Sequence, residues 1–217
     1  IFAGVGLSML IAAPIGAAAS QVGTLIMWAT EQAPLVMGIL VSVIVGVALT
    51  LPISSAAICA ALGLTGLAGG AAVAGCCAQM IGFAVMSYKE NGVGGLVSQG
   101  LGTSMLQMGN IVKNPRIWIA PTLASAITGP LATCVFHFEM NGAAVSSGMG
   151  TCGLVGQIGV YTGWVSDIAA GVKTAITPMD WAAMVLLCFV LPAVLSVIFC
   201  EIERKMGWIK EGDLKLN

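Results

Sequence analysis

A histidine and a glutamate two positions apart are the side chains in this sequence best suited to binding a ligand. His137 is the only histidine of the chain, and Glu139 follows an uncharged run that begins after Arg116. Ionisable groups are costly to bury in apolar segments, which makes them candidates for function. The Glu139 carboxylate can accept hydrogen bonds from hydroxyl groups, and the His137 imidazole can donate or accept one. The alternative is that both side chains only extend their polar ends to a membrane surface.

Neutral polar side chains follow this pair along a glycine-rich passage from Asn141 to Gly159. A row of amides and hydroxyls beside one carboxylate suits a small neutral polyhydroxy ligand better than an inorganic ion. The alternative is that these groups only cap short helices. The predicted ligand-binding residues are His137, Glu139, Asn141, Ser147, Thr151, Gln157 and, from an earlier corner of the chain, Asn114. We expect no catalytic residue and no enzymatic activity.

The backbone of the Asn141–Gly159 passage is also unusual. The passage is too apolar for a loop in water, and each glycine costs a helix about 1 kcal/mol relative to alanine. Irregular backbone at membrane depth is tolerated only where it is buried in protein or lines a cavity, so we expect a re-entrant passage. The run Gly148–Gly153 matches a GxGxxG motif. A dinucleotide site would require a βαβ unit around that motif, and the surrounding sequence does not provide one.

The amino-acid composition indicates that membrane-spanning helices must position the candidate ligand-binding residues. Of the 217 residues, 58% are hydrophobic and 8% are charged, whereas a soluble domain is about 25% charged. The predicted class is therefore an all-α polytopic integral membrane protein surrounded by membrane lipid. The 29 glycines suit close helix packing in lipid. A net charge of −1 argues against nucleic acid as a partner.

The seven cysteines do not indicate a metal site. None forms a CxxC pair, and a single histidine is available to share a metal, so the ligand spacings of zinc sites are missing. Most of the cysteines stand in apolar runs, where Cys behaves as a small hydrophobic residue. We expect neither a metal nor a cofactor.

Five apolar segments approach or exceed the roughly 20 residues that cross a bilayer. They are Ile1–Trp28, Pro34–Leu51, Ala56–Ser87, Ile117–Phe138 and Trp181–Cys200. The glycine cluster Gly63–Gly70 is expected to weaken or break the third segment. Apolar residues of Gly94–Val112 can share one helical face, which predicts an amphipathic helix on the membrane surface. The alternative for Gly94–Val112 is another buried helix.

The positions of Lys and Arg predict the orientation. Lys89, the Lys113–Arg116 corner and the tail after Cys200 are the basic clusters, and the positive-inside rule places all three in the cytoplasm. The C-terminus is then cytoplasmic. We expect a single membrane domain over residues 1–217. This domain has three parts. Residues 1–112 contain the N-terminal spans and the surface helix, residues 113–200 contain the re-entrant passage and the ligand site, and residues 201–217 form the cytoplasmic tail.

Three glycine-containing stretches carry a family resemblance. They are LPISSAAICAALGLTGLAGGAA (Leu51–Ala72), NPRIWIAPTLASAITGPLAT (Asn114–Thr133) and GMGTCGLVGQIG (Gly148–Gly159). In content and order they resemble the membrane-embedded enzyme IIC family of the bacterial sugar phosphotransferase system, nearest to the branch that includes PfoR-like toxin regulators. Members of that branch are longer at the N-terminus, so this chain is expected to correspond to their C-terminal part.

The resemblance implies a homodimeric sugar-transporting subunit of the bacterial inner membrane. Cytoplasmic components of the phosphotransferase system would be its partners and would supply any phosphate. Family members commonly use a Glu and a His at a sugar site among re-entrant hairpins, and Glu139 and His137 are the acid–imidazole pair available here. Two alternatives stay open: a membrane sensor that binds a small ligand without moving it, and a structural fragment that has lost transport.

Overall fold

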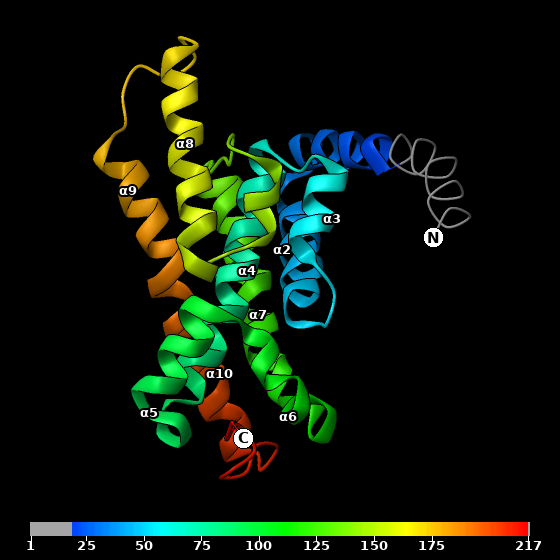
Figure 1. Ribbon diagram of the computed structural model, residues 1–217, viewed down its shortest axis with the longest axis vertical. Helices are drawn as coiled ribbons and strands as arrows, with labels where there is room; N and C mark the ends of the chain where they lie inside the picture. The colour runs from blue at the N-terminus through cyan, green and yellow to red at the C-terminus, as the bar shows by residue number, and fades with distance from the viewer. Residues whose placement is uncertain (1–18, 217) are drawn as a thin grey trace, which may run out of the picture.

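Helix α4 (Gly66–Met86) runs through the centre of the molecule, and the other helices are arranged around it (Figure 1). This computed structural model describes residues 19–216 of the chain. Three helices pack against α4: α2 (Pro34–Thr50), α7 (Ile119–Pro130) and α10 (Leu191–Lys205). Most α4 side chains are buried, because its many Ala, Gly and Cys residues let neighbouring helices approach closely.

Shorter helices complete the described part of the chain. A helix at residues 19–32 lies across one end of the bundle (Figure 1). The others are α3 (Ser55–Leu62), α5 (Tyr88–Val97), α6 (Met108–Lys113), α8 (Val155–Ala169) and α9 (Pro178–Val185). Within residues 19–216 the only β-type pairing is a single bridge between Gly66 and Met140. The predicted all-α membrane class is confirmed.

The backbones of α2, α4 and α7 approach each other where small residues face one another. A Cβ at Gly75 of α4 would lie 2.0 Å from the Ser42 carbonyl oxygen of α2, and one at Gly129 of α7 would lie 2.2 Å from the Gly38 carbonyl oxygen. The Ser42 hydroxyl donates to the Ser125 carbonyl oxygen at 2.8 Å. Close approach at small residues and interhelical hydrogen bonds are what hold helices together in lipid.

Three stretches among the described residues are long and apolar enough to cross a membrane: Gly66–Met86, Pro115–Val135 and Pro178–Lys205. They correspond to the third, fourth and fifth expected spans. Helix α2 covers the second, as a shorter apolar helix of 17 residues. Most of the first expected span, Ile1–Trp28, lies outside the described residues. Its described part belongs to the helix that crosses the end of the bundle.

The helix break expected within the glycine cluster Gly63–Gly70 occurs at the start of that cluster. Helix α3 ends at Gly63, whose backbone is left-handed (φ 64°, ψ 34°), and α4 begins at Gly66, with φ 62°. Glycine adopts such angles without steric cost. Gly69 and Gly70 continue as regular helix in α4, so the break is confined to the start of the cluster.

The structure corrects the continuous surface helix predicted over Gly94–Val112. The chain there passes from α5 through a π-helical turn (Ser98–Gly102) and a 3-10 turn (Ser104–Gln107) into α6. Thr103 is fully extended (φ −159°, ψ 141°), which ends the helical path. Most apolar residues of the stretch are at least partly exposed, but Ile111 is buried in an apolar core cluster, and several polar residues are buried as well. Val97, Leu101, Met105 and Val112 are exposed, whereas Gln99, Ser104 and Gln107 are buried.

Candidate ligand-binding site

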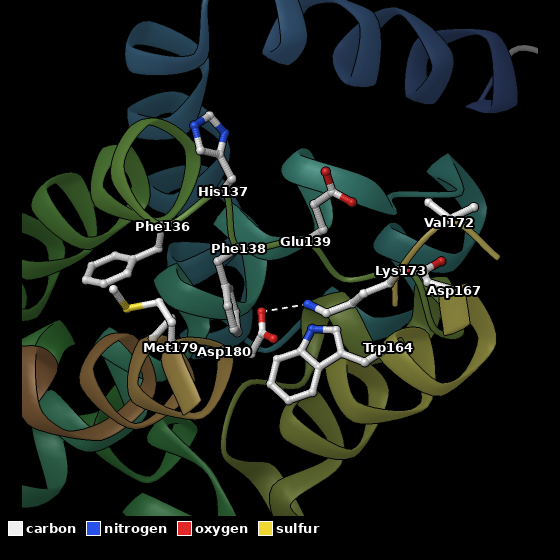
Figure 2. A pocket seen from close by; sticks show the side chains of 11 residues that line it. Phe136, His137, Phe138, Glu139, Trp164, Asp167, Val172, Lys173, Met179 and Asp180 are labelled. Carbon is white, nitrogen blue, oxygen red and sulfur yellow. Dashed lines mark hydrogen bonds and ion pairs between the residues drawn. The ribbon is translucent and has the colours of Figure 1, made fainter. Parts of the chain in front are cut away.

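A cavity of about 260 Å³ lies where α8, α9 and the segment after α7 meet (Figure 2). Residues 136–139 form one side of it, and Trp164 and Asp167 of α8 form another. Lys173, from the loop between α8 and α9, and Asp180, from the first turn of α9, complete its polar lining. A cavity with a few convergent polar groups is the usual form of a small-molecule site.

The segment that carries Glu139 is held by backbone hydrogen bonds to the turn after α7 and to the start of α4. The Phe138 N–H donates to the Ala132 carbonyl oxygen at 2.8 Å, and Gly66 and Met140 exchange two hydrogen bonds of 3.0 Å. Gly70 has no side chain, and a Cβ there would lie 1.6 Å from the Phe138 carbonyl oxygen. The position of this side of the cavity therefore depends on glycine at residue 70.

Asn141 brings two carboxylates together from different parts of the chain. Its Nδ2 donates to Oε2 of Glu139 at 3.0 Å and to Oδ2 of Asp167 at 2.9 Å. The Asn141 amide group has two N–H donors, so it can serve both carboxylates at once. Glu139 is exposed and Asp167 is half-buried. Each keeps a further carboxylate oxygen that can accept hydrogen bonds from a ligand.

Lys173 places a positive charge beside these carboxylates. Its Nζ lies 2.6 Å from Oδ1 of Asp180 (Figure 2) and 5.4 Å from the centre of the Trp164 ring. Oδ2 of Asp180 accepts from the N–H and hydroxyl of Thr177, at 2.7 and 2.8 Å, which caps the start of α9. The Lys173 N–H donates to the Asp167 carbonyl oxygen at 3.1 Å, so the loop is tied to the end of α8.

His137 lies at the edge of the cavity. Its backbone is left-handed, with φ 44°, a strained conformation for a residue with a Cβ. The imidazole is exposed and points away from Lys173 and Asp180 (Figure 2). Of the predicted acid–imidazole pair, Glu139 is therefore the member that joins the carboxylate cluster.

Three other predicted residues are buried and bonded within the protein. The Ser147 hydroxyl donates to the Leu64 carbonyl oxygen at 2.7 Å, and the Thr151 hydroxyl donates to the Gly100 carbonyl oxygen at 2.5 Å. Gln157 donates to the Cys77 sulfur at 3.3 Å. Their side chains are placed to hold the glycine-rich passage in position.

Asn114 lies at the opposite end of the molecule. Its Nδ2 donates to the Trp208 carbonyl oxygen at 2.9 Å and to Oδ2 of Asp213 at 2.8 Å. Asn114 comes directly after α6, and these bonds place it next to the C-terminal tail. Helices α8 and α9 meet at the other end of the molecule (Figure 1). The structure does not bring Asn114 together with Glu139.

Four residues of the cavity were not among the ligand-binding residues predicted from the sequence. They are Trp164, Asp167, Lys173 and Asp180. The sequence did contain one signal, because Lys173 is the single Lys or Arg outside the three basic clusters. Asp167 precedes Lys173 by six residues, and Asp180 follows it by seven. This spacing is as consistent with a local ion pair as with a membrane interface.

A second buried polar cluster surrounds Gln79 of α4. The Gln79 Oε1 accepts from Trp118 Nε1 at 2.9 Å, and its Nε2 donates to the Thr122 hydroxyl at 3.2 Å. The Thr50 hydroxyl lies 3.3 Å from the same Oε1 and 2.8 Å from the Ser104 hydroxyl. The oxygen of the Gln79 amide thus accepts two hydrogen bonds and its nitrogen donates one, which links α2, α4 and α7.

Comparison with known proteins identifies the family. The sequence profile described as "Phosphotransferase system, EIIC" matches residues 1–216. This chain belongs to that family. No protein with a curated description and no solved structure gives a match. Membership of the EIIC family makes the chain a multi-pass membrane subunit of the sugar-transport type.

Proposed function

We propose that the cavity between α8, α9 and residues 136–139 is the sugar-binding site of this EIIC subunit. The observation that carries this proposal is the joining of Glu139 and Asp167 by Asn141 at 3.0 and 2.9 Å, with Lys173 on the same cavity. The carboxylate oxygens can accept hydrogen bonds from sugar hydroxyls, and the Lys173 ammonium can donate to a sugar oxygen. Hydrogen bonds to charged groups are about twice as strong as neutral ones.

The charges of the cavity favour a neutral ligand over a phosphorylated one. Three carboxylates (Glu139, Asp167 and Asp180) face one ammonium, Lys173, which is already paired with Asp180. A phosphate group would add negative charge beside Glu139 and Asp167. We therefore assign phosphoryl transfer to partner proteins of the phosphotransferase system, with unphosphorylated sugar as the ligand of this cavity.

Binding assays with radiolabelled hexoses, hexitols and N-acetylhexosamines test this assignment on the purified protein. We expect saturable binding of at least one neutral sugar, and no competition by the corresponding sugar phosphate. Liposomes holding the protein then distinguish transport from sensing, because only a transporter equilibrates the sugar with the interior. Competition by the phosphate as strong as by the sugar itself would overturn the charge argument.

The glycine-rich passage supports the re-entrant arrangement that we propose for this site. From Met140, the passage reaches the middle of α4, where a Cβ at Gly150 would lie 2.7 Å from the Cβ of Cys76. Helix α8 then returns the chain to the cavity end of the bundle (Figure 1). The passage thus runs beside the central spanning helix and turns back at about half its length.

The distribution of charge supports a cytoplasmic C-terminus. Lys173 lines the cavity. Of the other seven Lys and Arg residues, four lie in residues 204–215, Lys89 pairs with Glu201 of α10, Lys113 ends α6 and Arg116 lies over the Trp208 ring of the tail. The positive-inside rule therefore places the cavity end outside and the tail end in the cytoplasm.

Labelling of single introduced cysteines tests this orientation. We expect an impermeant thiol reagent added outside cells to modify Val172→Cys, which is 80% exposed beside the cavity, and not Lys113→Cys. The unaltered chain is the control, because its exposed Cys134 defines the background. Modification of Lys113→Cys from outside would reverse the orientation.

A further inference from the structure

Glu139 and Asp167 form a pair of carboxylates on one side of the cavity. Asn141 donates to both of them, at 3.0 and 2.9 Å, and neither forms an ion pair within residues 19–216. Lys173 lines the same cavity but is paired with Asp180 at 2.6 Å. Two like charges held close together repel each other, and a cation that contacts both is attracted by both.

Among the described side chains that line the cavity, hydrogen-bond acceptors outnumber donors. The carboxylates of Glu139, Asp167 and Asp180 only accept. The donors are the Lys173 ammonium and Trp164 Nε1. A ligand that matches this lining supplies more donors than acceptors. A sugar hydroxyl has one donor and two acceptor lone pairs, whereas a primary ammonium group has three donors and no acceptor.

Lys173 shows how this cavity holds an ammonium group. Its Nζ lies 2.6 Å from Oδ1 of Asp180 and 5.4 Å from the centre of the Trp164 ring (Figure 2). The Trp164 ring is in turn fixed by an edge-on contact with Trp181, with 5.5 Å between the ring centres. A carboxylate and an aromatic face both attract an ammonium ion. The cavity thus already binds an ammonium group of the chain itself, next to the Glu139–Asp167 pair.

A metal ion fits the carboxylate pair less well than an ammonium group does. Calcium takes about six to eight oxygen ligands, and Asn141 turns its NH₂ group, which cannot bind a metal, towards both carboxylates. Within residues 19–216 no group of three or more His, Cys, Asp or Glu side chains could hold a metal ion. The lining therefore favours a cation that brings its own N–H donors.

We propose that the cavity selects an amino sugar, a hexose with a free and protonated amino group, over the matching hexose and its N-acetyl form. This preference rests on the proposed sugar site. The ligand ammonium donates to the free oxygens of Glu139 and Asp167, which makes these two the specificity-determining residues. A neutral hexose still binds, with lower affinity. N-acetylation removes the charge and two of the three N–H donors, so the carboxylate pair favours the N-acetyl form least.

Competition assays with matched sugars measure this preference on the purified full-length chain. The probes are glucose, galactose and mannose, the same hexoses with an amino group at carbon 2 or carbon 6, and the N-acetyl form of each amine. Hydrogen bonds to charged groups are about twice as strong as neutral ones. At neutral pH we therefore expect one amino sugar to bind at least about tenfold more tightly than its parent hexose and its N-acetyl form.

Two conservative variants test whether the carboxylate pair sets the preference. Glu139→Gln and Asp167→Asn should each weaken binding of the amino sugar more than binding of the hexose, so that the ratio of the two affinities falls towards one. Glu31→Gln should keep the full ratio, because Glu31 is exposed and does not line the cavity. A ratio compares two ligands on the same folded protein, so a general loss of stability does not change it.

The outcomes distinguish the preference from the sugar site itself. Equal affinity for every hexose and its amino forms overturns the preference and leaves the sugar site in place, whereas binding of no sugar at all overturns both. A ratio that both variants preserve shows that the amine binds away from Glu139 and Asp167, which overturns their role. Displacement of the amino sugar by calcium chloride at constant ionic strength assigns the carboxylate pair to a metal ion and overturns the preference as well.

Discussion

Gly70→Ala should abolish ligand binding at the cavity and destabilise the protein. The added methyl group would lie 1.6 Å from the Phe138 carbonyl oxygen, a backbone atom that cannot rotate away. Phe138 and the adjoining Glu139 must then move away from α4, which disturbs the hydrogen bonds that Met140 makes with Gly66. Forced backbone shifts of this kind typically cost about 1–3 kcal/mol.

Thermal unfolding in detergent and sugar binding measure the two effects. Gly109→Ala is the matched control, because nothing lies within 4 Å of a Cβ built there and Ala favours a helix over Gly. We expect a lower unfolding temperature and no measurable binding for Gly70→Ala, with neither change for Gly109→Ala. Unchanged binding in Gly70→Ala would mean that residues 136–139 do not form the ligand site.

Replacing the bridged carboxylates should weaken sugar binding strongly. Glu139→Gln and Asp167→Asn keep the size of each side chain but remove its charge. Loss of a charged hydrogen-bond partner typically costs about 1–3 kcal/mol, or roughly five- to a hundredfold in affinity. The double variant should lose more than either single one. Because the His137 imidazole points away from Lys173 and Asp180, His137→Ala should have the smaller effect.

Calorimetry with the sugar found in the binding panel gives these affinities. Glu31→Gln is the control, since Glu31 is exposed and does not line the cavity. Oligomer size and unfolding temperature should stay constant in all variants. If Glu139→Gln and Asp167→Asn both bind the sugar as tightly as the unaltered protein does, the assignment of the site fails.

The membrane class and the helix break at Gly63 could be predicted from the sequence because each depends on local information. Low charge and high apolar content leave only a membrane fold. A cluster of glycines weakens a helix wherever it stands. The path of Gly94–Val112 could not be predicted, because burial of Gln99 and Gln107 depends on contacts with Ser87 and the distant tail. Apolar periodicity alone does not contain that information.

The site could be predicted only in part for the same reason. Glu139 and Asn141, which belong to the proposed site, could be singled out because they border the irregular passage. Asp167 joins them through a hydrogen bond between residues 26 positions apart, and sequence spacing gives no indication of it. Ser147, Thr151 and Gln157 have the right chemistry for a ligand, yet their donors are bonded to protein atoms. The presence of a polar side chain does not by itself show whether that side chain faces a cavity or bonds to other protein atoms.

The most direct test of the sugar site is protection of a cysteine at its edge. Val172 lines the cavity and is 80% exposed, so Val172→Cys should react readily with a thiol reagent. With the cavity as the sugar site, saturating sugar slows this reaction, and the same sugar leaves the reaction of Lys215→Cys at the tail unchanged. Equal rates at Val172→Cys with and without a sugar that demonstrably binds the protein would contradict a sugar site in this cavity.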